Sequence, residues 1–371
     1  MTARALHFII PGDLASATGG YVYDRHIIDG LAARGWRVTV HPLDGSFPLP
    51  TGAALAHAAQ VLERLPDRAC VLIDGLALGS LAELIEAHRD RLTLIALMHA
   101  LASHEGDGAA AAADRLQRPA QVEQLEQRAL LSVQHVIVTG TCLRQALSER
   151  GLTATRLSLV EPGTAQVSVT PPTAHRGGDS AVALLCVATV SDGKGQELLL
   201  EALAPLAGLR WQLTCVGSLT RSPATVRRLR DQLQRLGLAE RVSLVGEVPH
   251  EVLSNFYHAA DLFVLATRRE SYCMAVAEAI AHGLTVISTL TGAIGDITAG
   301  EAGILGAPGD VDALRAALEA VLTQPGLLQS LRAGALAARA RLTPWSRACA
   351  RMSLLLARIS KQSHQRPFAL L

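Results

Sequence analysis

Short apolar runs alternate with helical patterns along almost the whole chain, and this alternation constrains the fold more than any other feature. In the first half the strand-like runs are Ala5–Ile10, Arg37–His41, Cys70–Ile73, Leu92–Met98 and His135–Val138. In the second half they are Ala181–Ala188, Gln212–Val216, Val242–Val245, Leu262–Ala266, Thr285–Ser288 and Gly303–Leu305. Alternating strands and helices predict βαβ units and parallel sheets. We therefore expect an α/β protein with two successive doubly wound, Rossmann-like domains.

The length of 371 residues also suits two domains of average size, each with its own hydrophobic core. Residues 169–180 collect prolines and glycines and lose periodicity, which is typical of a linker between domains. We expect a first domain over 1–168, a second over 181–344, and a last helix with its tail over 345–371 that could pack back on the first domain. Two such domains predict a cleft between them for the ligand.

The composition argues against several classes of partner. The formal net charge is +1, and no basic run is interleaved with aromatic residues, so we expect no nucleic-acid partner. The six cysteines are scattered without a close pair. This spacing favours neither a disulfide framework nor a thiolate metal site, and it fits a reducing compartment.

Signals for membrane insertion or export are not apparent in the sequence. Even the most apolar stretches, such as Leu92–Ala102 and Ala181–Val190, are interrupted too early to cross a bilayer. The start of the chain enters a strand-like run without the pattern of a secretion signal. We expect a cytoplasmic protein, and leave open a peripheral contact with the inner face of the membrane.

A lysine turn follows the first strand of the second half. The chain has two lysines, Lys194 and Lys361, and Lys194 stands between Gly193 and Gly195. Ligands in open α/β sheets bind at the carboxyl ends of the strands, and a compact ammonium group suits a phosphate oxygen there. The alternative is an ordinary solvated lysine in a turn.

Two glutamates follow the fourth strand of the second half. Glu270 lies in the loop, and Glu278 lies two turns along the helix that the loop opens. If this helix starts near Cys273, the amides of Cys273, Met274 and Ala275 are free donors for a phosphate or sugar oxygen. Glu278 could then accept hydrogen bonds from a ribose diol. The alternative is a pair of solvated carboxylates.

Three further turns at strand ends are candidates. Gly19 and Gly20 precede a helix expected from Tyr21, where adjacent glycines let backbone amides approach an anionic or polyhydroxylated ligand. Gly217 follows another strand and could face a phosphate or a base. His99 follows the apolar run that ends at Met98, at the expected cleft edge. A tight turn and a structural histidine are the respective alternatives.

No catalytic triad or metal cluster is apparent in the spacing of the residues. Asp24–His26 and Asp296 have no partners at metal-ligand spacing in the sequence. We therefore expect neither a metal nor a cofactor.

In this order, these features resemble glycosyltransferase family 4, the retaining nucleotide-sugar enzymes with the GT-B fold. The most specific part is Glu270–Glu278, which is similar to the family's E-x7-E loop and helix. Val187–Leu203 is similar to the strand, lysine turn and helix of its donor domain, and Glu161–Gly163 to the turn that closes its first domain. The resemblance spans nearly the whole chain and implies a nucleotide-sugar donor bound between two domains.

The resemblance also implies roles for these residues. Glu278 would hold the donor ribose, Glu270 the hydroxyls of the transferred sugar, and Lys194 the leaving diphosphate. His99 would contact the donor sugar from the first domain. The other implied binding groups are the amides of Cys273, Met274 and Ala275, the glycines Gly19, Gly20 and Gly217, and Glu247 in the segment Val245–Val248 that governs the choice of base.

The chain departs from the family in its charges and its glycines. The family often carries an arginine five residues before the lysine or immediately before it, but these positions are Thr189 and Gly193 here. Ser271 and Cys273 replace glycines that are usual after the first glutamate. The second cation of the phosphate clamp is therefore missing or supplied elsewhere, and the candidates are Arg25, Arg221, Arg268 and Arg269.

We predict a retaining, metal-independent hexosyltransferase that uses a UDP- or GDP-linked donor. Its hydroxyl acceptor is unidentified and could be a small molecule, a lipid-linked group or a glycan. Two alternatives remain open. One is a synthase that acts on a small sugar or sugar phosphate, and the other is a non-catalytic subunit that binds sugar nucleotides, which the missing arginine would favour.

Overall fold

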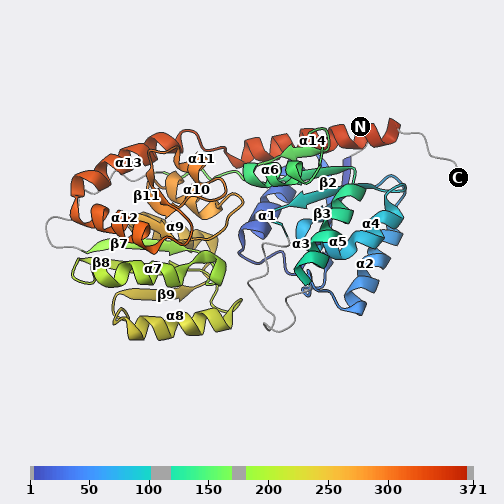
Figure 1. Cartoon of the computed structure of the whole chain (residues 1–371). Helices are drawn as coiled ribbons and strands as arrows, with labels where there is room; N and C mark the ends of the chain where they lie inside the picture. The colour runs from blue at the N-terminus through green and yellow to red at the C-terminus, as the bar shows by residue number, and fades with distance from the viewer. Residues whose placement is uncertain (1–3, 102–117, 169–180, 366–371) are drawn as a thin grey trace. The chain divides into compact units, whose positions relative to one another are not determined.

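The computed structural model describes residues 4–101, 118–168 and 181–365, which form two compact units (Figure 1). The first unit runs to Gly163 and also contains the C-terminal helix that begins at Trp345. The second unit runs from Thr164 to Pro344. The sequence places the first boundary at residue 168, somewhat later than the structure does, and the expected linker over 169–180 lies outside the described residues.

The first unit is built on a parallel sheet with the strand order β2-β1-β3-β4-β5-β6. Its strands are β1 (Arg4–Pro11), β2 (Trp36–Leu43), β3 (Cys70–Asp74), β4 (Thr93–Met98), β5 (His135–Val138) and β6 (Leu157–Leu159). Its helices are α1 (Gly19–Ala32), α2 (Gly52–Arg64), α3 (Gly75–Leu78), α4 (Ala82–His88), α5 (Arg118–Ser132), α6 (Thr141–Glu149) and α14 (Trp345–Gln365). Strands β3, β4 and β5 are buried at every residue, as expected for parallel strands that are covered on both faces.

The second unit has a parallel sheet with the strand order β12-β11-β10-β7-β8-β9. Its strands are β7 (Val182–Val187), β8 (Trp211–Val216), β9 (Val242–Gly246), β10 (Leu262–Leu265), β11 (Thr285–Thr289) and β12 (Gly303–Gly306). Its helices are α7 (Gln196–Leu203), α8 (Pro223–Arg235), α9 (His250–Ala259), α10 (Met274–Ala281), α11 (Ile294–Thr298), α12 (Val311–Thr323) and α13 (Pro325–Arg339). The core gathers buried side chains from both faces of this sheet, with Trp211, Tyr257 and Phe263 among the largest.

The predicted fold class is confirmed, because every strand pair in both sheets is parallel. Each expected strand is present, with both ends within two residues of the expectation. Only β6 is missing from the expectation, because three residues are too few to show a strand pattern. None of the cysteines forms a disulfide. Among the described helices, none combines the length and the apolar character that a bilayer crossing needs.

Strand order decides where each unit can bind a ligand. In the second sheet β7 pairs with both β10 and β8, and the chain leaves β7 and β10 in opposite directions. In the first sheet the same reversal falls between β1 and β3. At such a switch point the connecting segments diverge and leave a crevice at the carboxyl ends of the strands. Each unit therefore has one place in its sheet that favours a ligand.

Helix α14 packs against α1 within the first unit. The rings of His26 and Trp345 stack with their centroids 4.0 Å apart, and the indole N–H of Trp36 donates to Ser353 Oγ at 2.9 Å. Gly30 in α1 permits the approach, since a Cβ atom there would lie 2.2 Å from Cys349 Sγ and 2.5 Å from Cys349 Cβ.

This packing predicts whether a substitution of Gly30 raises or lowers the stability of the protein. Helix propensity alone favours alanine over glycine by about 1 kcal/mol in a helix interior. We nevertheless expect Gly30→Ala to destabilise the protein by about 1–3 kcal/mol, because the added methyl group overpacks the contact. The control is Gly326→Ala in α13, where an added Cβ atom would meet nothing within 4 Å apart from its chain neighbours and the backbone of its own helix, so stability should stay equal or rise slightly. Calorimetric unfolding checks both, and a Gly30→Ala protein as stable as the parent would contradict this packing.

Candidate functional site

Lys194 and Glu270 meet at the switch point of the second sheet. Lys194 follows β7, and Glu270 follows its neighbour β10. Lys194 Nζ donates to Glu270 Oε1 at 2.6 Å, and the two side chains are 32% and 10% exposed. Two residues that the sequence places in separate loops therefore form one partly buried ion pair.

The electrostatic surroundings keep Lys194 charged. Burial by itself lowers the pKa of Lys194, but the negative charge of Glu270 and the hydrogen bond to it outweigh burial, and the pKa is raised. A protonated ammonium group has three N–H donors, and the bond to Glu270 uses one of them. The ammonium group of Lys194 therefore still has N–H donors for an anion, although the pair as a whole is neutral.

The backbone around the pair leaves little room for other residues. Gly195 has a φ of 68°, and a Cβ atom there would lie 2.0 Å from the carbonyl oxygen of Ala266. The hydroxyl of buried Thr267 lies 3.0 Å from Glu270 Oε1, and the Arg268 amide donates to the Gly193 carbonyl at 2.8 Å. These contacts join the two loops directly and fix the distance between lysine and glutamate.

The N-terminus of α10 lies in the same loop region. Cys273 precedes the helix with a φ of 76°, and its side chain makes no capping hydrogen bond. The first amides of a helix lack intrahelical partners and carry the positive end of its dipole, so those of Met274 and Ala275 can serve an anion. Burial, and after it the charge of Glu270, raises the pKa of the Cys273 thiol, which is therefore neutral.

Glu278 is held inside the second unit by a tyrosine. Tyr257 of α9 is buried, and its hydroxyl donates to Glu278 Oε2 at 2.9 Å. The Tyr257 ring stacks on that of His282 with centroids 4.7 Å apart, and His282 Nδ1 lies 2.8 Å from the Glu278 carbonyl oxygen. Burial raises the pKa of the Glu278 carboxyl, while the bond from Tyr257 acts in the opposite direction. One oxygen of Glu278 is therefore oriented by the protein.

Gly217 and Glu247 occupy different surroundings. The Gly217 amide donates to the Gly246 carbonyl at 2.9 Å, and a Cβ atom at Gly217 would lie 2.1 Å from the Ala188 carbonyl oxygen. Close packing of the strand ends thus explains this glycine. Glu247 directly follows β9 and is exposed.

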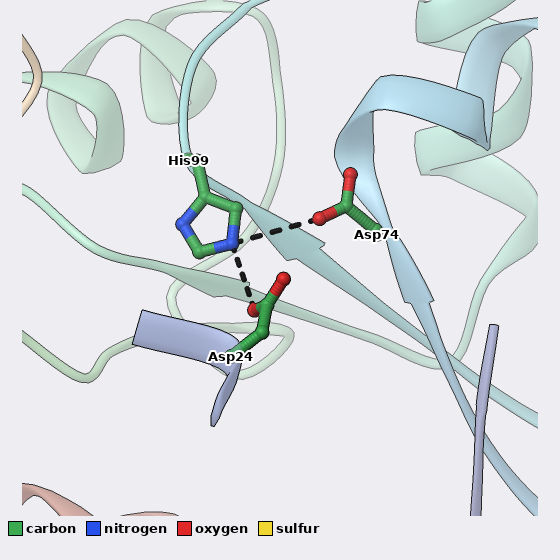
Figure 2. A group of neighbouring side chains, drawn as sticks. All are labelled: Asp24, Asp74 and His99. Carbon is green, nitrogen blue, oxygen red and sulfur yellow. Dashed lines mark hydrogen bonds and ion pairs between the residues drawn. The ribbon is translucent and has the colours of Figure 1, made fainter. Parts of the chain in front are cut away.

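In the first unit His99 lies against two aspartates, as Figure 2 shows. His99 Nε2 is 3.0 Å from Asp24 Oδ1 and 3.6 Å from Asp74 Oδ2. Asp24 comes from α1 and is fully buried, Asp74 is the last residue of β3, and His99 directly follows β4. The Asp74 carboxylate also accepts the Leu76 amide at 2.7 Å.

This cluster corrects the interpretation of Asp24. The sequence shows no partner for Asp24 at metal-ligand spacing, yet the side chains of Asp24, Asp74 and His99 each place a potential ligand atom within 4.8 Å of the others. The spacing rule fails because the three residues come from separate βα units that the strand order brings together. Asp74, a polar residue at the end of an apolar strand, could have been found by the same argument that singles out His99.

The helix start near Gly19 and Gly20 differs from the expectation. Helix α1 begins at Gly19, two residues before Tyr21, so both glycines belong to its first turn. A Cβ atom at Gly20 would lie 3.3 Å from His99 Cδ2. Close approach to His99, and not a left-handed turn, is therefore the physical reason for glycine at position 20.

The four arginines that could supply the second cation of the phosphate clamp have different surroundings. Arg25 is half-buried and donates to the carbonyl oxygens of Leu14 and Ser16, the latter at 2.8 Å. Arg221, Arg268 and Arg269 are exposed, and the last two directly precede Glu270 in the sequence. The loop that carries Glu270 therefore offers two arginines close to the lysine in the chain.

Thr267 helps to hold the lysine and the glutamate, although the sequence does not single it out. A threonine that follows a run of fully buried apolar residues is a weak signal, because threonine is common in strands. Its three hydrogen-bonding neighbours, the carboxylate of Glu270 and the carbonyls of Gly193 and Arg269, become visible only in the folded chain.

Known proteins are similar to this chain in sequence over part of its length, and in fold. Residues 181–324 match the family described as glycosyl transferases group 1. A D-inositol 3-phosphate glycosyltransferase of Geodermatophilus obscurus is 31% identical over 258 residues, which are 65% of this chain and 57% of that protein. A lipopolysaccharide core biosynthesis mannosyltransferase of Rhizobium meliloti is 30% identical over 158 residues, which are 41% of this chain and 44% of that protein. The chain thus spans about half the length of these relatives.

Solved structures show the same architecture. The sucrose-phosphate synthase of Thermosynechococcus elongatus superposes with a TM-score of 0.80 at 22% identity, over 97% of this chain and 100% of that one. The Anabaena protein HepE in complex with UDP-glucose gives a TM-score of 0.72 at 17% identity, over 95% of this chain and 99% of that one. At these identities the likeness shows the fold alone, which is the GT-B fold.

The raised pKa of Glu278 predicts a pH-dependent gain of stability on its removal. The pKa of this carboxyl is higher in the folded protein than in the unfolded chain. The free energy of unfolding therefore decreases as the pH rises through the pKa of the folded state. Glu278→Gln keeps an acceptor for Tyr257 and removes the charge, so we expect a higher Tm at a pH of about 7.5. The gain should shrink as the pH falls toward about 4.3, the ordinary pKa of a glutamate.

Thermal unfolding at a series of pH values measures this effect. Glu247→Gln is the matched control, because Glu247 is exposed and its removal should leave the Tm unchanged. A Glu278→Gln protein that is less stable than the parent at neutral pH, or whose difference from the parent does not vary with pH, would show that burial does not penalise this charge.

Proposed function

We propose that this chain, whose residues 181–324 match the group 1 glycosyltransferases and whose fold is GT-B, is a glycosyltransferase that transfers a hexose from a UDP- or GDP-linked donor to a hydroxyl acceptor. The observation that carries this proposal is the ion pair between Lys194 and Glu270 at the switch point of the second sheet, next to the first turn of α10. A cation and a helix N-terminus in one loop region suit the diphosphate of such a donor.

In the proposed mechanism, the second unit stabilises the leaving nucleoside diphosphate. Lys194 supplies a full positive charge, and the amides of Met274 and Ala275 add the positive end of the α10 dipole. Charges and dipoles that are fixed before the reaction stabilise developing negative charge without reorganisation. Because these groups compensate the diphosphate, we propose that its departure needs no metal bound to it.

The two glutamates have separate proposed roles. Glu270, oriented by Lys194 and Thr267, accepts hydrogen bonds from hydroxyls of the transferred sugar. Glu278, oriented by Tyr257, accepts them from the donor ribose. His99 stays the proposed contribution of the first unit to sugar binding, and we propose that the anomeric configuration is retained.

The names of two similar proteins favour a phosphorylated small acceptor as a more specific candidate. A relative of this chain is named as a D-inositol 3-phosphate glycosyltransferase, and a solved structure with the same fold is a sucrose-phosphate synthase. Both names point to a phosphorylated cyclitol or sugar. We propose to test such acceptors first, before lipid-linked and glycan acceptors.

We also propose that the transfer takes place in the cytoplasm.

The proposed roles predict a large loss of transfer without loss of fold. Lys194→Ala and Glu270→Gln should each lower the rate of transfer by about 100-fold or more, as removal of a group that stabilises the transition state typically does. Lys361→Ala, which removes the other lysine, is the matched control and should retain full activity. The measurement is release of UDP or GDP from the donor, with the anomeric configuration of the product read by NMR.

The outcomes separate the proposal from its alternatives. Saturable nucleotide binding without hydrolysis or transfer to any acceptor would identify a non-catalytic binding subunit. Full activity of both Lys194→Ala and Glu270→Gln would contradict the assigned roles, and an inverted product would contradict retention.

A further inference from the structure

A second place for a ligand lies in the first unit, at the switch point between β1 and β3. Asp74 ends β3, His99 follows the adjacent β4, and Asp24 lies on α1, which is the connection that leaves β1. Polar side chains at or after the ends of three adjacent strands, β1, β3 and β4, therefore converge where the sheet topology favours a ligand. Figure 2 shows both carboxylates directed toward the same imidazole nitrogen.

The spacing of these atoms fits one metal ion. Two ligand atoms that each lie about 2.0–2.2 Å from a metal are about 3.0–3.6 Å apart in octahedral or tetrahedral coordination. The measured separations of His99 Nε2 from Asp24 Oδ1 and Asp74 Oδ2 are 3.0 and 3.6 Å. The ligand atoms of all three side chains lie within 4.8 Å of one another, so one ion can contact them if the side chains move closer together.

The buried charge points to a cation as the missing partner. Asp24 is 0% exposed, and its Oδ2 atom is buried without any hydrogen-bond partner among the described residues. A buried carboxylate oxygen without a partner is costly. A divalent cation balances the charge of two carboxylate ligands, and a histidine that ligates a metal does so as the neutral imidazole.

We propose that Asp24, Asp74 and His99 bind one divalent cation of the Zn²⁺ or Mn²⁺ type. One nitrogen and two carboxylate ligands suit these ions better than Ca²⁺ or Mg²⁺, which prefer oxygen ligands alone. The Leu76 amide, bound to Asp74 Oδ1, orients this carboxylate as an outer partner of the site. Three protein ligands leave a coordination position for water or a substrate oxygen.

The proposed metal site includes His99, to which the proposed function assigns a contact with the donor sugar, so it adds a metal ligand role to that residue. Its test needs neither donor nor acceptor. The full-length protein is stripped of metal and titrated with Co²⁺, whose visible absorption reports coordination, and with Zn²⁺ and Mn²⁺ by calorimetry. We expect one bound ion per chain and a rise of Tm with metal concentration, since an ion that binds only the folded state stabilises it. Asp24→Asn and Asp74→Asn should each weaken binding at least tenfold.

Other histidine pairs supply the controls. His7 and His41 lie 3.0 Å apart between Nδ1 and Nε2, and the rings of His258 and His282 lie 4.8 Å apart, so both pairs could collect ions by themselves. His41→Gln and His258→Gln should leave the affinity unchanged. If either of them abolishes binding, the ion does not lie at the aspartates.

The test remains decisive even if one of the variants does not fold. Circular dichroism checks each protein before titration, and if Asp24→Asn does not fold, Asp74→Asn and His99→Gln decide. If calorimetry detects no binding of Co²⁺, Zn²⁺ or Mn²⁺ to the parent protein, the proposal is overturned, and so it is if the parent and the folded aspartate variants bind with equal affinity. Either result would leave the cluster as a histidine hydrogen-bonded to two carboxylates.

Discussion

The ion pair between Lys194 and Glu270 depends on the order of the strands, and the rest of the proposed donor site depends on this pair. Glu270 holds the lysine charged in a partly buried position, and Thr267 holds Glu270 in place. The pair forms because β7 and β10 are neighbours in the sheet although two strands separate them in sequence. A different strand order would place the same side chains in separate turns.

The sequence predicts the parts of this site better than their assembly. Strand ends can be read from apolar runs, so Lys194, Glu270 and His99 stand out because ligands bind at such ends. The contacts of Asp24 with Asp74 and His99, and of Tyr257 with Glu278, cannot be found in that way. Their partners lie on other elements, and which elements become neighbours is decided by the packing of the whole sheet.

Several features of the candidate sites are unfavourable for folding. Cys273 adopts a left-handed conformation that L-residues rarely take, Glu278 carries a carboxylate whose pKa is raised by burial, and Asp24 has a buried oxygen without a partner among the described residues. Backbone strain and unsatisfied polar groups of this kind concentrate where a protein binds or reacts. Their occurrence at the two switch points supports a ligand at each, independently of any resemblance.

The most direct measurement uses the scarcity of lysine in this chain. Lysine labelled with ¹³C at Cε gives signals from two residues only, Lys194 and Lys361, so both can be followed by NMR during titration with UDP or GDP. Our account predicts that the Lys194 signal shifts and saturates with one of these nucleotides while the Lys361 signal stays unchanged. A nucleotide that binds by calorimetry without moving the Lys194 signal would contradict the central role of the ion pair.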